Sequence, residues 1–166
     1  MCTQRAVFLT AVCFSVFAGL GCGHAPPPSP CTGPEPIAVS LLARPKVNPD
    51  DAGQSLSTVV RLYMLKSKAK LEAAGMDELL ARDRDALADD LLSVVEVTLN
   101  PNDRAQRMLP RPPEARYVAA VGLFRNASGT AWRAIARLPA RDPDHCRRQT
   151  PARVSFVLED SRLESR

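Results

Sequence analysis

Apolar and polar residues alternate along much of the chain after residue 36, which is typical of β-strands with one buried face. In the first such segment, 36–45, Ile37, Val39 and Leu41 fall on one face. Both faces are apolar at 116–124, so we expect that segment to be a central strand. The remaining segments with this alternation lie, in chain order, at 57–66, 92–99, 131–139 and 152–160.

The hydrophobic period changes between the segments at 57–66 and 92–99. Residues 67–92 contain no β-branched side chain, and Leu80, Leu87 and Leu91 recur there at helical spacing. Ser67 is a suitable N-cap and Gly75 a suitable stop. We therefore expect two short helices inserted between strands.

An acidic run, Asp83, Asp85, Asp89 and Asp90, lies in this insertion. We interpret it as a solvated helix face, because no calcium-loop spacing accompanies it.

Short strands separated by turn signals predict a mainly β fold, an antiparallel β-sandwich with a helical excursion. Trp132 is expected in its core. On the second strand, Arg61 and Tyr63 fall on the face opposite Val60, Leu62 and Met64. Two readings of that face stay open: it contacts a partner, or it is ordinary surface.

The N-terminal segment predicts export. One charge, Arg5, precedes an apolar run from Ala6 to Leu20 that is too short to span a bilayer and matches the core of a secretory signal. The run ends at Cys22, and the small residues before it resemble the lipobox of bacterial lipoproteins, although Gly19 stands where that motif usually has Leu. We expect residues 1–21 to be a lipoprotein signal peptide and Cys22 to carry a covalent lipid. By the same resemblance, Gly23 permits sorting to the outer membrane.

Residues 22–35 then read as a tether. The stretch "GHAPPPSPCTGPEP" has no apolar periodicity, and its prolines favour polyproline II, which gives a reach on the order of 40 Å. The folded domain is expected to occupy residues 36–166.

The cysteines fit this division of the chain. Cys2 and Cys13 lie in the signal, which leaves Cys31 and Cys146 in an oxidising compartment. We hypothesise that these two pair in a disulfide; two independent free thiols are the alternative.

Composition and motifs point away from catalysis. Without the signal the chain has 21 Lys and Arg against 18 Asp and Glu, a balance that does not favour nucleic acid. No phosphate-binding loop or nucleophile elbow is present, so we expect no enzyme activity, no cofactor, no metal and no small-molecule substrate. Asp142, Asp144, His145 and Cys146 form a local cluster of candidate metal ligands, although Cys146 has a competing disulfide partner. A periplasmic enzyme with a metal at Asp142, Asp144 and His145 is the competing hypothesis.

Three stretches, taken in order, resemble the TssJ family of type VI secretion lipoproteins. The first, "VNPDDAGQSLSTVVRLYMLKSKAKLEAAGMDELLARD", combines an Asn-Pro-Asp loop, an Arg-x-Tyr-x-Leu strand and two helices. The second, "VTLNPNDRAQ", is similar to the family's strand-turn-strand, with Asn102 where the family often has Gly. The third is "VAAVGLFRNASGTAWRAIARL", and the likeness runs from Ile37 to Leu158.

This resemblance implies a transthyretin-like β-sandwich with a helical insertion at about 67–92, lipid-anchored on the periplasmic face of the outer membrane. It implies a non-enzymatic protein that binds the periplasmic domain of TssM and so anchors the trans-envelope complex of the secretion system. A lipid-anchored pilotin or assembly factor of another envelope machine is the alternative. The loop implied in partner binding falls on Val47, Asn48, Pro49, Asp50, Asp51, Gly53 and Gln54.

Overall fold

The computed structural model describes residues 35–142, 144 and 151–166. The signal segment, Cys22, Cys31, His145 and Cys146 lie outside these residues, so the lipidation, disulfide and metal hypotheses stay predictions. The described helices and strands are β1 (Glu35–Val47), β2 (Thr58–Leu65), α1 (Ala69–Ala73), α2 (Met76–Leu87), the 3-10 turn η1 (Ala88–Asp90), β3 (Leu91–Leu99), β4 (Arg104–Arg111), β5 (Tyr117–Gly122), β6 (Arg133–Arg137), β7 (Ala152–Asp160) and β8 (Arg162–Ser165).

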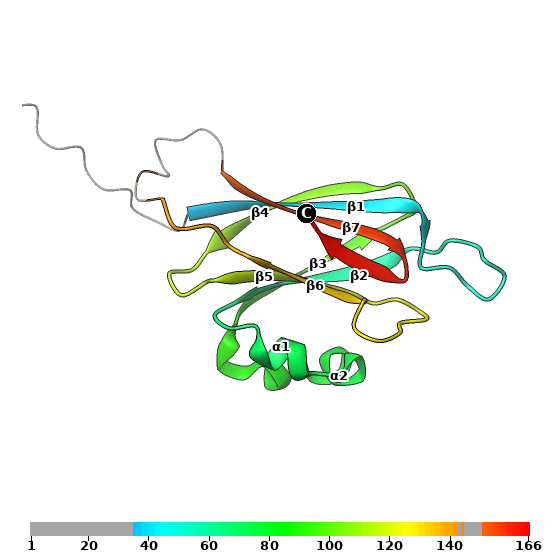
Figure 1. Ribbon diagram of the computed structural model, residues 1–166, viewed down its shortest axis with the longest axis horizontal. Coiled ribbons are helices and arrows are strands. Elements are labelled where there is room, and N and C mark those ends of the chain that lie inside the picture. The colour runs from blue at the N-terminus through cyan, green and yellow to red at the C-terminus, as the bar shows by residue number, and fades with distance from the viewer. Residues whose placement is uncertain (1–34, 143, 145–150) are drawn as a thin grey trace, which may run out of the picture.

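The strands form two four-stranded sheets that pack face to face (Figure 1). One sheet has the order β4-β1-β7-β8 and the other the order β3-β2-β5-β6. The mainly β sandwich fold is thereby confirmed. One detail differs from a purely antiparallel sandwich, because β1 and β7 run parallel, with Ile37 opposite Ala152. Alternation with period two carries no information on strand direction, so the sequence pattern could not reveal this pair.

Apolar side chains from the two inner faces fill the space between the sheets. Ile37, Leu41 and Phe156 come from one sheet and Leu62 and Met64 from the other, and all five are at most 2% exposed. Trp132 is also buried, as expected, and its indole N–H donates to the Gly129 carbonyl at 2.8 Å. Burial of this interface is the main contribution to the stability of the domain.

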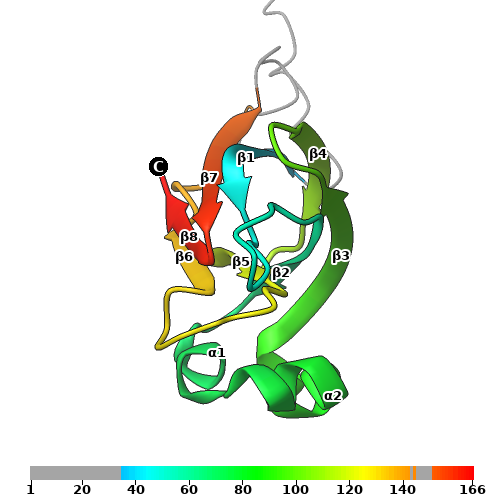
Figure 2. The same cartoon turned by 90° about the vertical axis from the view of Figure 1, so that its right-hand side faces the viewer.

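The helical insertion adds a third layer on the outer face of the β3-β2-β5-β6 sheet (Figures 1 and 2). Leu71 of α1 and Leu79 and Leu87 of α2 are buried against it. Both faces of β5 are therefore covered, and β5 lies between β2 and β6. This confirms the central position expected from its apolar faces.

Two strands extend the sandwich beyond what alternation predicted. β4 pairs with β1 along the full register from Glu35 opposite Arg111 to Leu42 opposite Arg104. β8 follows β7 through a tight turn and pairs back on it. The Leu163 N–H of β8 also donates to the Ala131 carbonyl just before β6, at 2.7 Å, so β8 joins the two sheets along one side.

The long strand β1 defines the two ends of the sandwich. Its 13 residues span roughly 40 Å at the usual rise per residue. The chain enters the domain at Glu35, and the loop that follows Val47 extends from the opposite end (Figure 1). Among the residues that the structure describes, no helix has the length and apolar character needed to cross a membrane.

Candidate functional site

The loop between β1 and β2, residues 48–57, is held at its base by the side chain of Asn48. Asn48 is 5% exposed and has φ +48°, a left-handed conformation that Asn tolerates better than most residues. Its Oδ1 accepts the Arg125 N–H at 2.7 Å, and its Nδ2 donates to the Ser57 carbonyl at 2.9 Å. Its backbone N–H donates to the Asp160 carbonyl at the end of β7. Asn48 thus bonds to three other parts of the chain, two through its side chain and one through its backbone.

The outer part of the loop is ordered by Asp50. Its Oδ1 accepts the backbone N–H groups of Ala52 at 3.0 Å and Gln54 at 2.8 Å, which is an Asx-turn arrangement. The Asp50 N–H donates in turn to the Gln54 carbonyl at 2.9 Å. Gly53 has φ +78°, a conformation that glycine adopts without steric cost. The result is a small preformed turn rather than a loose excursion.

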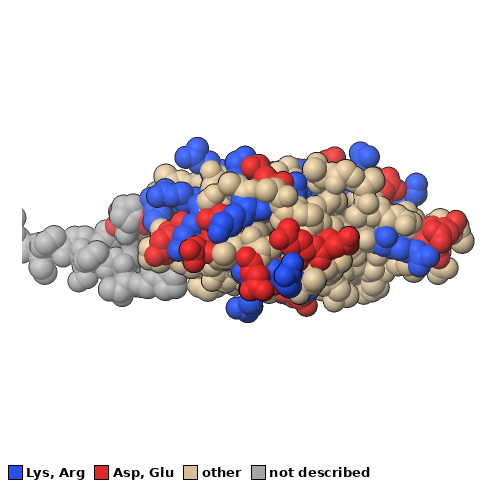
Figure 3. All heavy atoms as spheres, turned by 90° about the horizontal axis from the view of Figure 1, so that it is seen from below, with Lys and Arg blue, Asp and Glu red and all other residues tan. Residues whose placement is uncertain are grey.

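Charged groups of both signs gather around this loop. The Asp51 carboxylate pairs with the Arg125 guanidinium at 2.9 Å, and Lys46 pairs with Asp160 at 3.1 Å. Asp51 and Arg125 are 78% and 53% exposed, so their ion pair contributes little to folding stability. Figure 3 shows basic and acidic atoms next to each other at this end of the molecule.

The seven residues implied in partner binding fall into two groups. Val47 and Asn48 are buried, and Pro49 and Asp50 are partly buried, so these residues support the loop. Asp51, Gly53 and Gln54 are exposed and form its tip. Two accessible residues were missed by the sequence reasoning, Ala52 within the loop and Arg125 from the β5–β6 connection. The Phe-Arg turn motif contained Arg125, but nothing in the sequence placed it beside Asp51.

The Arg61 and Tyr63 face of β2 is neither partner-facing nor ordinary surface. Tyr63 is 0% exposed, and its hydroxyl donates to Asp83 of α2 at 3.1 Å. Arg61 donates from Nε to Glu96 at 2.7 Å and from Nη1 to the Leu79 carbonyl at 2.9 Å. Both open readings were therefore wrong, because this face binds the helical insertion.

The hydrogen bonds of this face affect its ionisable groups. Burial raises the pKa of Tyr63 to about 12, although the neighbouring Arg61 opposes that shift. Burial is the largest single influence on Arg61 and acts to lower its pKa, but the hydrogen bond to Glu96 and the interactions with Tyr63 and Asp83 together raise that pKa overall. Asp83 is partly buried and paired with Arg61 at 3.5 Å, so it differs from the solvated helix face expected for the acidic run.

A second arginine, Arg133 of β6, fastens the other helix. It donates to the carbonyls of Leu71 at 2.6 Å, Ala74 at 2.8 Å and Glu72 at 2.6 Å, which are groups at the C-terminal end of α1. Burial lowers the pKa of Arg133. Its guanidinium also lies 4.7 Å from the centre of the Trp132 ring. Arg61 and Arg133 therefore hold α2 and α1, respectively, against one sheet.

Groups suited to metal binding do not gather in the described part of the chain, where no cluster of three or more His, Cys, Asp or Glu side chains occurs. Asp142 and Asp144 are described, and Asp142 Oδ1 accepts the Asp144 N–H at 3.0 Å.

Taken together, these features define a small two-sheet β-sandwich that presents an ordered, charged loop at the end away from its chain entry. Over residues 35–156 the sequence matches the T6SS-SciN family, described as "Type VI secretion lipoprotein, VasD, EvfM, TssJ, VC_A0113". Because the match spans more than half of the 166 residues, the chain belongs to this family of type VI secretion lipoproteins. A search of curated proteins gave no match.

Solved structures support the same fold. The T6SS lipoprotein TssJ1 from Pseudomonas aeruginosa is 23% identical with a TM-score of 0.67, covering 80% of this chain and 97% of that one. The Serratia marcescens protein Lip, a membrane-bound component of the type VI secretion system, is 21% identical with a TM-score of 0.71, covering 80% and 98%. A chain of the structure described as "T6SS protein TssM C-terminal domain (869-1107) from EAEC" is 20% identical with a TM-score of 0.65, covering 80% and 98%.

Proposed function

We propose that this protein is the outer-membrane lipoprotein of a type VI secretion membrane complex. In this proposal a lipid on Cys22 anchors it to the periplasmic face of the outer membrane. The tip of the 48–57 loop, together with Arg125, binds the periplasmic domain of TssM and thereby fixes the trans-envelope complex. Its role is structural, and it requires no catalytic group or cofactor.

One observation carries the proposal: the preformed loop lies at the opposite end of β1 from Glu35, where the chain arrives from the anchor (Figure 1). A domain anchored through the segment before Glu35 can direct this loop away from its own membrane. Binding sites on rigid scaffolds usually occupy such connections. Membership of the type VI lipoprotein family supports the choice of partner. So does the likeness to one chain of a solved structure whose description names the TssM C-terminal domain.

The geometry of the tip suits a protein contact. Asp50 and Gly53 fix the backbone before binding, so less conformational entropy is lost when the partner arrives. The exposed pair of Asp51 and Arg125 offers both signs of charge for partner selection. Charges at the rim of an interface act mainly on specificity and association rate.

Metabolic labelling tests the anchor. Cells supplied with labelled palmitate should yield a labelled wild-type protein in the outer-membrane fraction, whereas Cys22→Ser should remove the label and release the protein from that fraction. A wild-type chain without label, or one that fractionates with cytosol, contradicts the anchor.

Capture from detergent-solubilised membranes tests the partner. We expect the wild-type bait to retain TssM and a bait with Asp51→Lys and Gln54→Lys to retain much less. Met108 is exposed on β4, away from the loop, so Met108→Lys serves as a control that should capture TssM normally. Equal capture by the loop variant and the wild type would place the contact elsewhere.

A further inference from the structure

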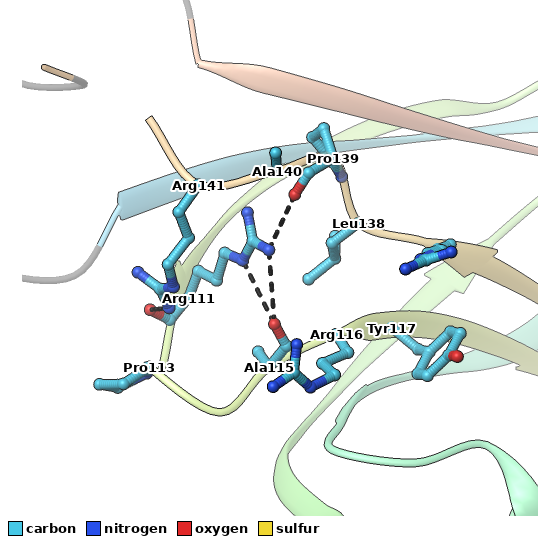
Figure 4. Close-up of a pocket in the computed structure, with 10 residues that line it drawn as sticks. Arg111, Pro113, Ala115, Arg116, Tyr117, Leu138, Pro139, Ala140 and Arg141 are labelled. Atoms are coloured by element: carbon cyan, nitrogen blue, oxygen red, sulfur yellow. Dashed lines mark hydrogen bonds between the residues drawn. The ribbon is translucent and has the colours of Figure 1, made fainter. Parts of the chain in front are cut away.

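Four arginines surround a pocket at the end of the sandwich where β1 begins (Figure 4). The pocket has a volume of about 750 Å³, and no acidic residue is among those that line it. Arg111 comes from the end of β4, Arg116 from the turn before β5, Arg137 from the end of β6, and Arg141 from the segment that follows. Elements from both sheets therefore bring positive charge to one place.

Arg111 forms the buried floor of this pocket. Its side chain is 5% exposed, and its Nη1 pairs with Glu35 at 3.1 Å. Its Nη2 donates to the Pro139 carbonyl at 2.9 Å and to the Ala115 carbonyl at 3.4 Å. Burial lowers the pKa of Arg111, and the neighbouring Arg141 and Arg116 lower it further, while Glu35 opposes both effects. Glu35 pairs with this one arginine of the pocket.

The other three arginines carry the excess charge. Arg116, Arg137 and Arg141 are all exposed. Arg141 is positioned by its hydrogen bonds to the carbonyls of Arg111 and Pro112. The ion pairs within the described part of the chain do not include Arg116 or Arg137.

Acidic groups do occur near these segments in the sequence. Glu114 lies in the turn between β4 and β5, and Asp142 and Asp144 follow Arg141, but these carboxylates are not part of the pocket lining. The charged groups in the pocket lining are therefore all guanidinium groups. A planar guanidinium group can donate two parallel hydrogen bonds to two oxygens of one phosphate. A phosphate group is therefore a suitable ligand for this pocket.

We propose that this pocket binds the phosphate groups of anionic phospholipids at the surface of the membrane that anchors the protein. The inference rests on the proposed lipid anchor. Glu35, which pairs with the pocket floor, follows Cys22 by 13 positions, a distance of at most about 45 Å in a fully extended chain. The pocket lies at the chain-entry end of β1, and the partner-binding loop at the other. Headgroup binding there would orient the sandwich with its pocket end on the membrane and its long axis pointing away from the surface. The loop at the other end would then face the partner.

The proposal is tested with the chain from residue 22 onward carrying Cys22→Ser, which retains every described residue and has no lipid of its own. Its binding is measured on vesicles of phosphatidylglycerol in phosphatidylcholine and on vesicles of phosphatidylcholine alone. We expect preferential binding to the anionic vesicles and a loss of at least about tenfold with Arg116→Gln plus Arg137→Gln, because each basic residue near an anionic surface contributes to attraction. Both substituted side chains are exposed, so thermal unfolding should match the wild type.

The matched control is Arg84→Gln plus Arg107→Gln, which removes the same charge from exposed positions outside the pocket. Near-normal vesicle binding by this control, with loss in the pocket variant, supports the proposal. Equal loss in both variants overturns it, because general charge would then explain the attraction. Binding of inorganic phosphate without any binding to anionic vesicles also overturns it, since the site would then serve a free anion.

A pocket variant that keeps vesicle binding but loses capture of TssM overturns the proposal in favour of a protein contact. These outcomes are separate from the anchor itself, because the tested chain carries no lipid. Failure of palmitate labelling would contradict the proposed function and leave the vesicle result intact.

Discussion

The Asn48 side chain accepts the backbone N–H of Arg125, 77 positions later, at 2.7 Å. This hydrogen bond connects the first loop of the sandwich to the connection between β5 and β6, which belongs to the other sheet. It also sets Arg125 beside the loop, where its guanidinium pairs with Asp51. The exposed tip therefore depends on a buried amide for its position.

We expect Asn48→Ala to lower the free energy of unfolding by about 2 kcal/mol, because the Arg125 N–H and the Ser57 carbonyl would lose their partner and alanine is disfavoured at φ +48°. Urea unfolding measures this loss. Hydrogen exchange should also become faster in the 49–56 segment.

Asn126→Ala is the matched control, since Asn126 is an exposed asparagine next to Arg125. We expect it to change stability by less than about 0.5 kcal/mol. If both variants had the same stability as the wild type, the buried amide would not organise the loop.

The two neighbouring aspartates of the loop should behave differently. Asp50→Ala removes the acceptor for the Ala52 and Gln54 N–H groups, so we expect a disordered tip and weaker TssM binding through a higher entropic cost. Asp51→Ala leaves the turn intact and removes only a rim charge, so its effect should fall mainly on the association rate and its salt dependence. Surface plasmon resonance at two salt concentrations separates these effects. Identical kinetics for the two variants would contradict the division between a supporting and a contacting residue.

Stability should fall at alkaline pH because of Tyr63. Its pKa is raised from 10 to about 12 by burial, so the folded state favours the neutral phenol. The stabilisation is complete below pH 10, the unfolded value, and is lost as the pH rises toward 12.

Tyr63→Phe should cost about 1 kcal/mol at neutral pH through loss of the hydrogen bond to Asp83, and it should flatten the decline between pH 10 and 12. Chemical denaturation across that pH range provides the measurement. An equally steep decline in Tyr63→Phe would assign the alkaline effect to other groups.

Arg133→Met should release α1 from the sheet. Three carbonyls at the end of α1 would lose their donor, and we expect a loss of about 2 kcal/mol in the free energy of unfolding, with faster hydrogen exchange confined to 69–74. Arg137→Met, four positions along β6 and exposed, is the control and should leave α1 protected. Unchanged exchange in both variants would mean that apolar burial of Leu71 alone holds the helix.

Local pattern was enough to predict most of the strands and both helices. Ile37, Val39 and Leu41 alternate because one face of β1 is buried. The leucine spacing in the insertion was a weaker guide, because α2 buries Leu79 and Leu87 while Leu80 is 44% exposed and Leu91 already begins β3. β8 was missed because only Leu163 in that segment is apolar and buried. The parallel pairing of β1 with β7 is a property of the assembled sheet and leaves no trace in the pattern of either strand.

The candidate site was predictable only in part, for a similar reason. The likeness to the TssJ family placed the loop, yet it could not show that Asn48 is buried or that Arg125 completes the tip. Tyr63 and Arg61 were misassigned because alternation placed them on the face away from the sandwich core, and only the folded insertion covers that face. Contacts between segments tens of residues apart decide these roles.

The central claim is that the tip of the 48–57 loop contacts TssM, and site-specific photocrosslinking in cells tests it most directly. A photoreactive amino acid replaces Gln54, which is exposed at the tip, and in a second strain replaces Arg107, which is exposed on β4. We predict an adduct containing TssM from position 54 and none from position 107. An adduct from position 107 with none from position 54 would contradict the account.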